Sequence, residues 1–159
     1  TKKILNFYLN FNKKNFFISK LFYSFFSRNM EKKIFSKFYL SLNDLKKMKK
    51  AGMIIGGHAV THTLMTKLKK KNIQKEIKKS AKFIKSLNNN QLSFCYPYGG
   101  VASYNKYIIS ILKKNNFDFS ISVENRDITE LDFKKNRFSL PRYNCNKFPF
   151  GKPEKNIYN

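Results

Sequence analysis

From residue 41 onward the sequence alternates between helical and strand patterns, and this alternation is the strongest constraint on its fold. Helices are predicted at about 42–51, 72–87 and 103–115, and strands at 53–55, 92–96, 117–123 and 138–140. Strands that alternate with helices indicate a parallel sheet, either open or closed into a barrel. We therefore predict an α/β fold whose functional residues lie on the loops that follow the strands.

Local signals mark the predicted helices. Ser41-Leu42-Asn43-Asp44 resembles a capping box, and Gly52 can end the first helix in a left-handed conformation. The second helix carries apolar residues at helical spacing: Ile73, Ile77, Ala81, Ile84 and Leu87. Lysines occupy its remaining surface, which is a solvated face or, as an alternative, a basic interaction surface. The third helix is expected to bury Tyr107, Ile108, Ile111 and Leu112.

The domain organisation follows from where patterns are present or absent. Residues 1–40 are aromatic and rich in lysine, and we expect one or two helices there that pack Phe16, Phe22, Phe25 and Phe26 onto a neighbour. No repeat or linker divides residues 41–150, which we interpret as one domain, and residues 151–159 are predicted to form a loose tail.

No membrane segment or signal peptide is recognisable. No uninterrupted apolar run approaches the roughly 20 residues that a membrane helix needs, and no small-residue cleavage site follows the aromatic opening. On the chain as given we favour a cytoplasmic location. The two cysteines are too few for a disulfide framework, and Cys95 is most simply a small buried hydrophobic residue.

The net charge of +24 would ordinarily indicate a nucleic acid or an anionic membrane as partner. However, the basic residues are almost all lysine, and they accompany many Asn, Phe and Ile residues. Codons rich in A and T encode this whole set, whereas selection for phosphate contacts would favour arginine, whose planar fork matches phosphates. We therefore interpret the charge as a solvated surface and expect no nucleic-acid partner.

Both histidines lie in the stretch Gly56-Gly57-His58-Ala59-Val60-Thr61-His62-Thr63, directly after the predicted strand 53–55. The glycines allow a sharp turn at the carboxyl end of that strand. Neutral imidazole is the commonest metal ligand, and two histidines four residues apart can share one ion on a helix or a tight loop. The alternative interpretation is a pair of solvated loop histidines.

A second loop of interest, Tyr96-Pro97-Tyr98-Gly99, follows the strand predicted at residues 92–96. Consecutive parallel strands are neighbours, so the carboxyl-end loops of the two strands should face one another. Taken alone, this second loop is a tight turn with packed aromatic rings.

Together the two loops resemble the polysaccharide deacetylase family. The family motifs H-[ST]-x-x-H and F-A-Y-P-Y-G have counterparts here in His58-Ala59-Val60-Thr61-His62 and Phe94-Cys95-Tyr96-Pro97-Tyr98-Gly99. The resemblance extends from about residue 40 to 150 and includes Leu140-Pro141-Arg142. It implies part of a distorted (β/α) barrel whose N-terminal strands are missing from this chain.

The resemblance also implies roles for individual residues. His58 and His62 would bind a divalent metal, most often zinc, and Tyr98 would belong to the catalytic site, with its backbone N–H directed at the oxyanion. Tyr96, Pro97, Tyr98 and Arg142 would contact the substrate, although a plain surface role for Arg142 stays open. A metal would polarise the acetamide carbonyl and an N–H donor would stabilise the oxyanion. The implied substrate is an N-acetylated glycan or sugar precursor.

This sequence departs from the family pattern in several respects. The T-F-D-D-G stretch, whose aspartates supply the base and a metal ligand, is not found, and we expect it upstream of Thr1. There is no third histidine, Thr63 replaces a common proline, and Cys95 stands where many members have arginine. We therefore expect a carboxyl-terminal portion of a deacetylase that is inactive by itself. The alternatives are a non-catalytic glycan-binding relative and a basic nucleic-acid-binding protein.

Overall fold

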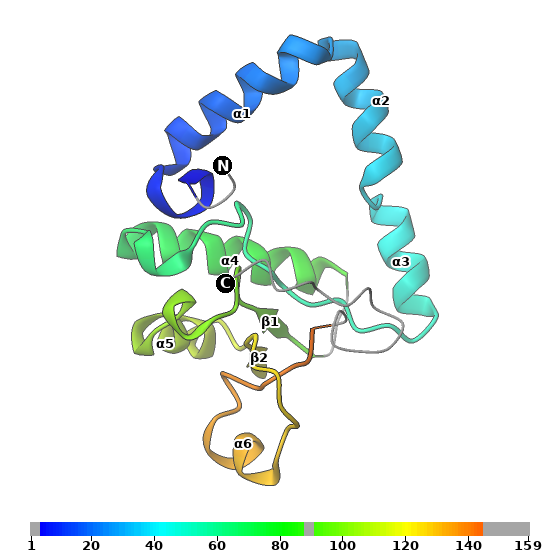
Figure 1. The fold of residues 1–159 in the computed structure, drawn as a ribbon. Coiled ribbons are helices and arrows are strands. Elements are labelled where there is room, and N and C mark those ends of the chain that lie inside the picture. The colour runs from blue at the N-terminus through cyan, green and yellow to red at the C-terminus, as the bar shows by residue number, and fades with distance from the viewer. Residues whose placement is uncertain (1–3, 88–90, 145–159) are drawn as a thin grey trace. The chain divides into compact units, whose positions relative to one another are not determined.

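The structure is a computed structural model that describes residues 4–87 and 91–144. The chain divides into two compact units, Thr1–Ile55 and Gly56–Asn159. The described part of the first unit is helical, and that of the second unit combines helices with parallel strands (Figure 1). The boundary between the units falls inside the region predicted as one domain, and the predicted tail 151–159 lies outside the described residues.

The first unit is a succession of helices with polar caps. These are a short π-helix η1 (Ile4–Tyr8), α1 (Phe11–Phe25), α2 (Arg28–Phe38) and α3 (Leu42–Lys50). The side chains of Asn10, Ser27 and Ser41 each accept a backbone N–H at the start of the α-helix that follows. In α3 the capping box is confirmed, because Asp44 Oδ2 also accepts the N–H of Ser41 at 2.9 Å.

The aromatic residues expected to pack onto a neighbour form no buried core within the described part of the first unit. No residue of α1 or α2 is buried, and Phe16 and Phe25 are 62% and 74% exposed. Extended residues such as Phe26 (φ −131°, ψ 137°) separate the helices, so they do not fold back on one another. Their aromatic contacts are local instead, as between Phe22 and Phe26, whose ring centroids are 5.0 Å apart.

The predicted buried strand at residues 53–55 is also absent. Met53 and Ile54 are 53% and 65% exposed. Pairing begins only at Gly57, whose N–H donates to Ser93 O at 2.8 Å and whose carbonyl accepts from Cys95 N at 2.7 Å. A short apolar run forms a buried strand only where neighbours cover it, and the side chains of Met53 and Ile54 are exposed.

The second unit is organised around parallel strands. β1 (Ser93–Cys95) pairs with β2 (Phe119–Ile121), with Phe94 opposite Ser120. Single parallel bridges join Gly57 to Phe94 and Leu140 to Ile121. Four segments therefore run side by side in the order in which they occur along the chain, as the alternation of helices and strands predicts. The described residues show a small parallel sheet, which confirms the α/β prediction, and they do not show the barrel of which the chain was expected to form a part.

Two amphipathic helices cover this sheet, as predicted. α4 (Lys70–Ser86) buries Ile73, Ile77, Ala81 and Ile84, and α5 (Lys106–Lys114) buries Ile108, Ile111 and Leu112. Tyr107, which was also expected to be buried, is only partly buried. The buried residues share one core with Phe94, Tyr96 and Phe117. α4 approaches Gly57 so closely that a Cβ there would lie 2.5 Å from Ser80 Oγ and 2.9 Å from Ile84 Cδ1. The glycine at this point therefore lets the helix pack on the strand.

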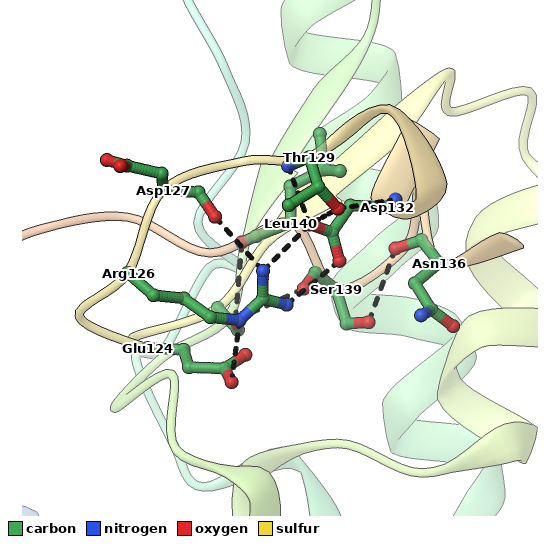
Figure 2. A network of polar contacts seen from close by, with 9 residues as sticks. Glu124, Arg126, Asp127, Thr129, Asp132, Asn136, Ser139 and Leu140 are labelled. Atoms are coloured by element: carbon green, nitrogen blue, oxygen red, sulfur yellow. Dashed lines mark hydrogen bonds and ion pairs between the residues drawn. The ribbon is translucent and has the colours of Figure 1, made fainter. Parts of the chain in front are cut away.

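The segment after β2 contains a short helix, α6 (Glu130–Lys135), that the sequence analysis does not predict. A polar network holds it in place (Figure 2). Arg126 donates from Nη1 and Nη2 to the two carboxylate oxygens of Asp132, at 2.7 and 2.8 Å, and Asp132 also accepts the N–H of Thr129. Within the described ranges, no helix is long and apolar enough to span a membrane.

Candidate metal and substrate site

The loop that contains both histidines, residues 58–63, is called the histidine loop. It follows Gly57 directly and contains two strained residues. Ala59 and His62 have φ values of 60° and 50°. This left-handed region is uncommon for residues other than glycine, and it persists only where the surroundings enforce it. Such strain often marks functional loops, and here it falls on one of the two predicted metal ligands.

The ring of His58 is oriented by the backbone of β1. His58 Nδ1 lies 2.7 Å from the carbonyl oxygen of Cys95. A carbonyl oxygen can only accept, so Nδ1 carries the hydrogen and, in the neutral ring, the lone pair lies on Nε2. Metal-binding histidines commonly have this arrangement, in which the nitrogen that does not bind metal donates to a carbonyl or a carboxylate.

The two predicted loops come together at their aromatic rings. The centroids of His58 and His62 are 4.8 Å apart with the rings edge to face, and those of His62 and Tyr98 are 5.0 Å apart. Tyr98 itself has a left-handed backbone, with φ of 67°. The structure thus places both histidines and Tyr98 in one group, as expected if loops after neighbouring strands face each other.

Cys95 and Arg142 lie beside this group. A hydrogen bond with the Cys95 side chain raises the pKa of His58, while burial and the charge of Arg142 oppose that change. Burial by itself would raise the pKa of the Cys95 thiol, but the hydrogen bond with His58 and the charge of Arg142 outweigh it and lower that pKa. The structure therefore brings Arg142 to the site, and Cys95 takes part in the site as more than a buried apolar residue.

Tyr96 and Pro97 anchor their loop in the protein core. Both side chains are fully buried. The hydroxyl of Tyr96 donates to Phe138 O at 2.8 Å and accepts from Ser120 Oγ at 2.7 Å, and its ring stacks on that of Tyr104. Neither side chain offers a surface to a ligand in this structure, whereas the side chain of Tyr98 is only half-buried.

Three described aspartates are engaged in other contacts. Asp44 caps α3, Asp118 Oδ2 accepts the N–H of Leu92 at 2.7 Å, and Asp132 pairs with Arg126. Within residues 4–87 and 91–144, no group of three His, Cys, Asp or Glu side chains could hold a metal ion. The imidazole pair fits two of the three protein ligands that a catalytic zinc normally has.

Sequence reasoning missed one residue that contacts the histidine loop, Glu76. Its Oε2 accepts the N–H groups of Val60 and Thr61, at 2.7 and 2.9 Å. A signal was present in the sequence, because Glu76 is the single acidic residue within the lysine-rich helix α4.

Comparison with known proteins identifies the family. The sequence model for polysaccharide deacetylase matches residues 16–120, which is more than half of the chain. The chain belongs to the polysaccharide deacetylase family. The matched range includes both histidines, Cys95 and Tyr98. The match therefore assigns the chain to a family of enzymes.

A solved deacetylase structure is similar to this polysaccharide deacetylase family member. It is the Streptococcus pyogenes deacetylase PplD in complex with acetate, with 26% sequence identity and a TM-score of 0.58. The similarity covers 65% of this chain and 44% of that protein, so the chain spans less than half the length of PplD. No curated protein matches the chain.

Proposed function

We propose that this chain supplies two metal ligands and a substrate-facing loop of a metal-dependent deacetylase that removes N-acetyl groups from amino sugars in a glycan or glycan precursor. The observation that carries the proposal is the grouping of His58, His62 and Tyr98 within the region that matches the family. The carbonyl of Cys95 adds support, because it holds His58 in the tautomer that leaves Nε2 for a metal.

Each residue has a role in this proposal. When bound, a divalent metal such as zinc would polarise the acetamide carbonyl. His58 and His62 would hold it, and the ring of Tyr98 would form a wall beside His62. The left-handed backbone of Tyr98 sets the direction of its peptide N–H, a suitable donor to a developing oxyanion. The guanidinium of Arg142 adds positive charge near His58 and Cys95.

Two parts of the chemistry must come from beyond the residues that the structure describes. A hydrolytic zinc site needs a third protein ligand, and removal of a proton from water needs a general base. No described carboxylate joins the histidines, so we propose that residues outside residues 4–87 and 91–144 supply both groups.

Acetate release tests the proposal. The protein, expressed at the length that its gene encodes and loaded with zinc, should release acetate from oligomers of N-acetylglucosamine. Loss of a hydrogen-bond partner of a metal ligand typically lowers activity by roughly 10–100-fold. His62→Ala, which removes a ligand itself, should lower acetate release by more than that. Tyr107→Phe is the control, since its hydroxyl only accepts from Gln74 at the surface of α5. Equal acetate release by the wild type and His62→Ala would contradict the proposal.

A further inference from the structure

Glu76 lies on α4 and its side chain reaches the histidine loop. We propose that Glu76 is a positioning residue that fixes the His62 half of the candidate metal site, an inference that rests on the proposed function. A single carboxylate oxygen, Oε2, accepts the N–H of Val60 at 2.7 Å and the N–H of Thr61 at 2.9 Å. Bonds to an ionised acceptor are roughly twice as strong as those between neutral groups.

The two bonded peptides lie between the strained residues of the loop. Ala59 comes directly before Val60, and His62 comes directly after Thr61, and both have left-handed backbones. Successive N–H groups that point at one oxygen form a small anion-binding concavity. Glu76 fills this concavity from within the chain, and in doing so it holds the peptides on which the conformations of Ala59 and His62 depend.

The surroundings of Glu76 separate it from an ordinary surface acid. α4 carries one acidic residue among many lysines. Lys75, Lys78 and Lys79 are exposed, whereas Glu76 is half-buried, and its described bonds run to the loop. A carboxylate in a lysine-rich helix could pair with its neighbours at i±3 or i±4. Here it is turned toward the loop instead.

The two histidines have separate anchors. His58 is held by the carbonyl of Cys95, which involves β1 and not α4. His62 follows the segment that Glu76 holds. Loss of the carboxylate should therefore displace His62 and change the 4.8 Å separation of the rings, while His58 keeps its bond to Cys95. If Glu76 were needed only for stability, its loss would not affect the His62 ring and spare the His58 ring.

The experiment compares Glu76→Ala, Glu76→Gln and the control Lys75→Ala, an exposed neighbour on α4, in the protein at its natural length. Two quantities are measured: the affinity for Zn²⁺ alone, and the NMR signals of the loop amides and imidazoles in metal-free protein. Glu76→Ala should weaken Zn²⁺ binding by about 10–100-fold, the range for outer partners of metal ligands. Glu76→Gln keeps an acceptor oxygen and should lose less, and Lys75→Ala should match the wild type.

In metal-free Glu76→Ala the amide signals of Val60 and Thr61 should move upfield and the His62 ring signals should shift, while His58 keeps its Nδ1–H form. Unchanged loop amides and unchanged Zn²⁺ affinity in both Glu76 variants would overturn the inference. If the wild type takes up no Zn²⁺ but the loop amides still respond, the anchoring by Glu76 stands and the proposed function fails. Should Glu76→Ala not fold, Glu76→Gln decides on the same two readouts.

Discussion

The imidazole of His58 donates an Nδ1–H hydrogen bond to the backbone carbonyl of Cys95 over 2.7 Å. The thiol of the same cysteine is the largest cause of the raised pKa of His58. Cys95→Ala removes the thiol and keeps the carbonyl, so it should lower the pKa of His58 toward the ordinary value of about 6.5. An NMR titration of metal-free protein measures this directly, and Cys95→Ser, which retains a hydrogen-bonding group, is the control.

The raised pKa of His58 also makes the stability of the folded protein depend on pH. Contacts that favour protonated His58 stabilise the folded protein below the ordinary pKa, and this stabilisation is lost as the pH rises through the pKa of the folded state. The pH-dependent part of the difference between the wild type and Cys95→Ala should therefore be largest below about pH 6.5 and shrink above it. An identical His58 titration in the two proteins would contradict this account.

Gly99 should not tolerate a side chain. Its φ is 69°, and an added Cβ would contact Val123 Cγ2 and lie 3.0 Å from the Val123 nitrogen. Gly99→Ala should lower the free energy of unfolding by about 2 kcal/mol or more, because overpacking adds to backbone strain. Gly100→Ala is the matched control: its neighbourhood is open and its φ is −69°, so urea unfolding should show little change. Equal effects of the two substitutions would be inconsistent with this geometry.

The hydroxyl of Tyr96 is bonded within the protein, to Phe138 O and Ser120 Oγ. Burial raises the pKa of Tyr96 well above its ordinary value. Tyr96→Phe leaves the Ser120 hydroxyl and the Phe138 carbonyl without this partner, and should cost about 1 kcal/mol of stability. The Michaelis constant for an N-acetylated oligomer should stay unchanged. Tyr107→Phe, which loses a bond at the surface, should cost less. A raised Michaelis constant in Tyr96→Phe alone would contradict this prediction and support the substrate contact that the resemblance implies.

Asp132 should make stability depend on acid pH. Hydrogen bonds from Arg126, and then from Thr129, hold the pKa of this carboxyl well below its ordinary range (Figure 2). The stabilisation is present above the ordinary pKa of about 3.9 and is lost as the pH falls through the pKa of the folded state. Asp132→Asn should lower the melting temperature at pH 7, and the difference should shrink in strong acid.

Glu130→Gln is the control for this prediction. Glu130 lies on the same helix, α6, and pairs with Lys134 in an exposed i, i+4 contact. Exposed pairs contribute little to stability. If Glu130→Gln lowers the melting temperature as much as Asp132→Asn does, the network around Arg126 contributes no more to stability than an exposed ion pair.

The parts of the fold that could be predicted from the sequence rest on local signals. The capping box at Ser41 and the helical spacing of Ile73, Ile77 and Ile84 require only neighbours in the chain. The run Met53-Ile54-Ile55 needed a neighbouring segment to become a buried strand, and periodicity cannot supply that information. For α6 a signal existed in Thr129 and Asp132, three residues apart, but the helix is too short to show an apolar period.

The same distinction, between features that follow from sequence patterns and features that depend on tertiary contacts, applies to the site. The meeting of His62 with Tyr98 could be predicted because neighbouring parallel strands bring their carboxyl-end loops together. Tyr96, which the resemblance places in contact with the substrate, is buried because strand side chains alternate and Tyr96 shares the core face with Phe94. The bonds of Glu76 to the loop, and of Cys95 O to His58, depend on tertiary distances that no spacing in the sequence specifies.

The measurement that tests the central claim most directly is the metal content of the protein at its natural length after exposure to Zn²⁺ and removal of excess ion. The account predicts one bound zinc per chain in the wild type and almost none in His58→Ala or His62→Ala, with each variant still folded by circular dichroism. A wild type that retains no metal, or histidine variants that retain as much as the wild type, would contradict it.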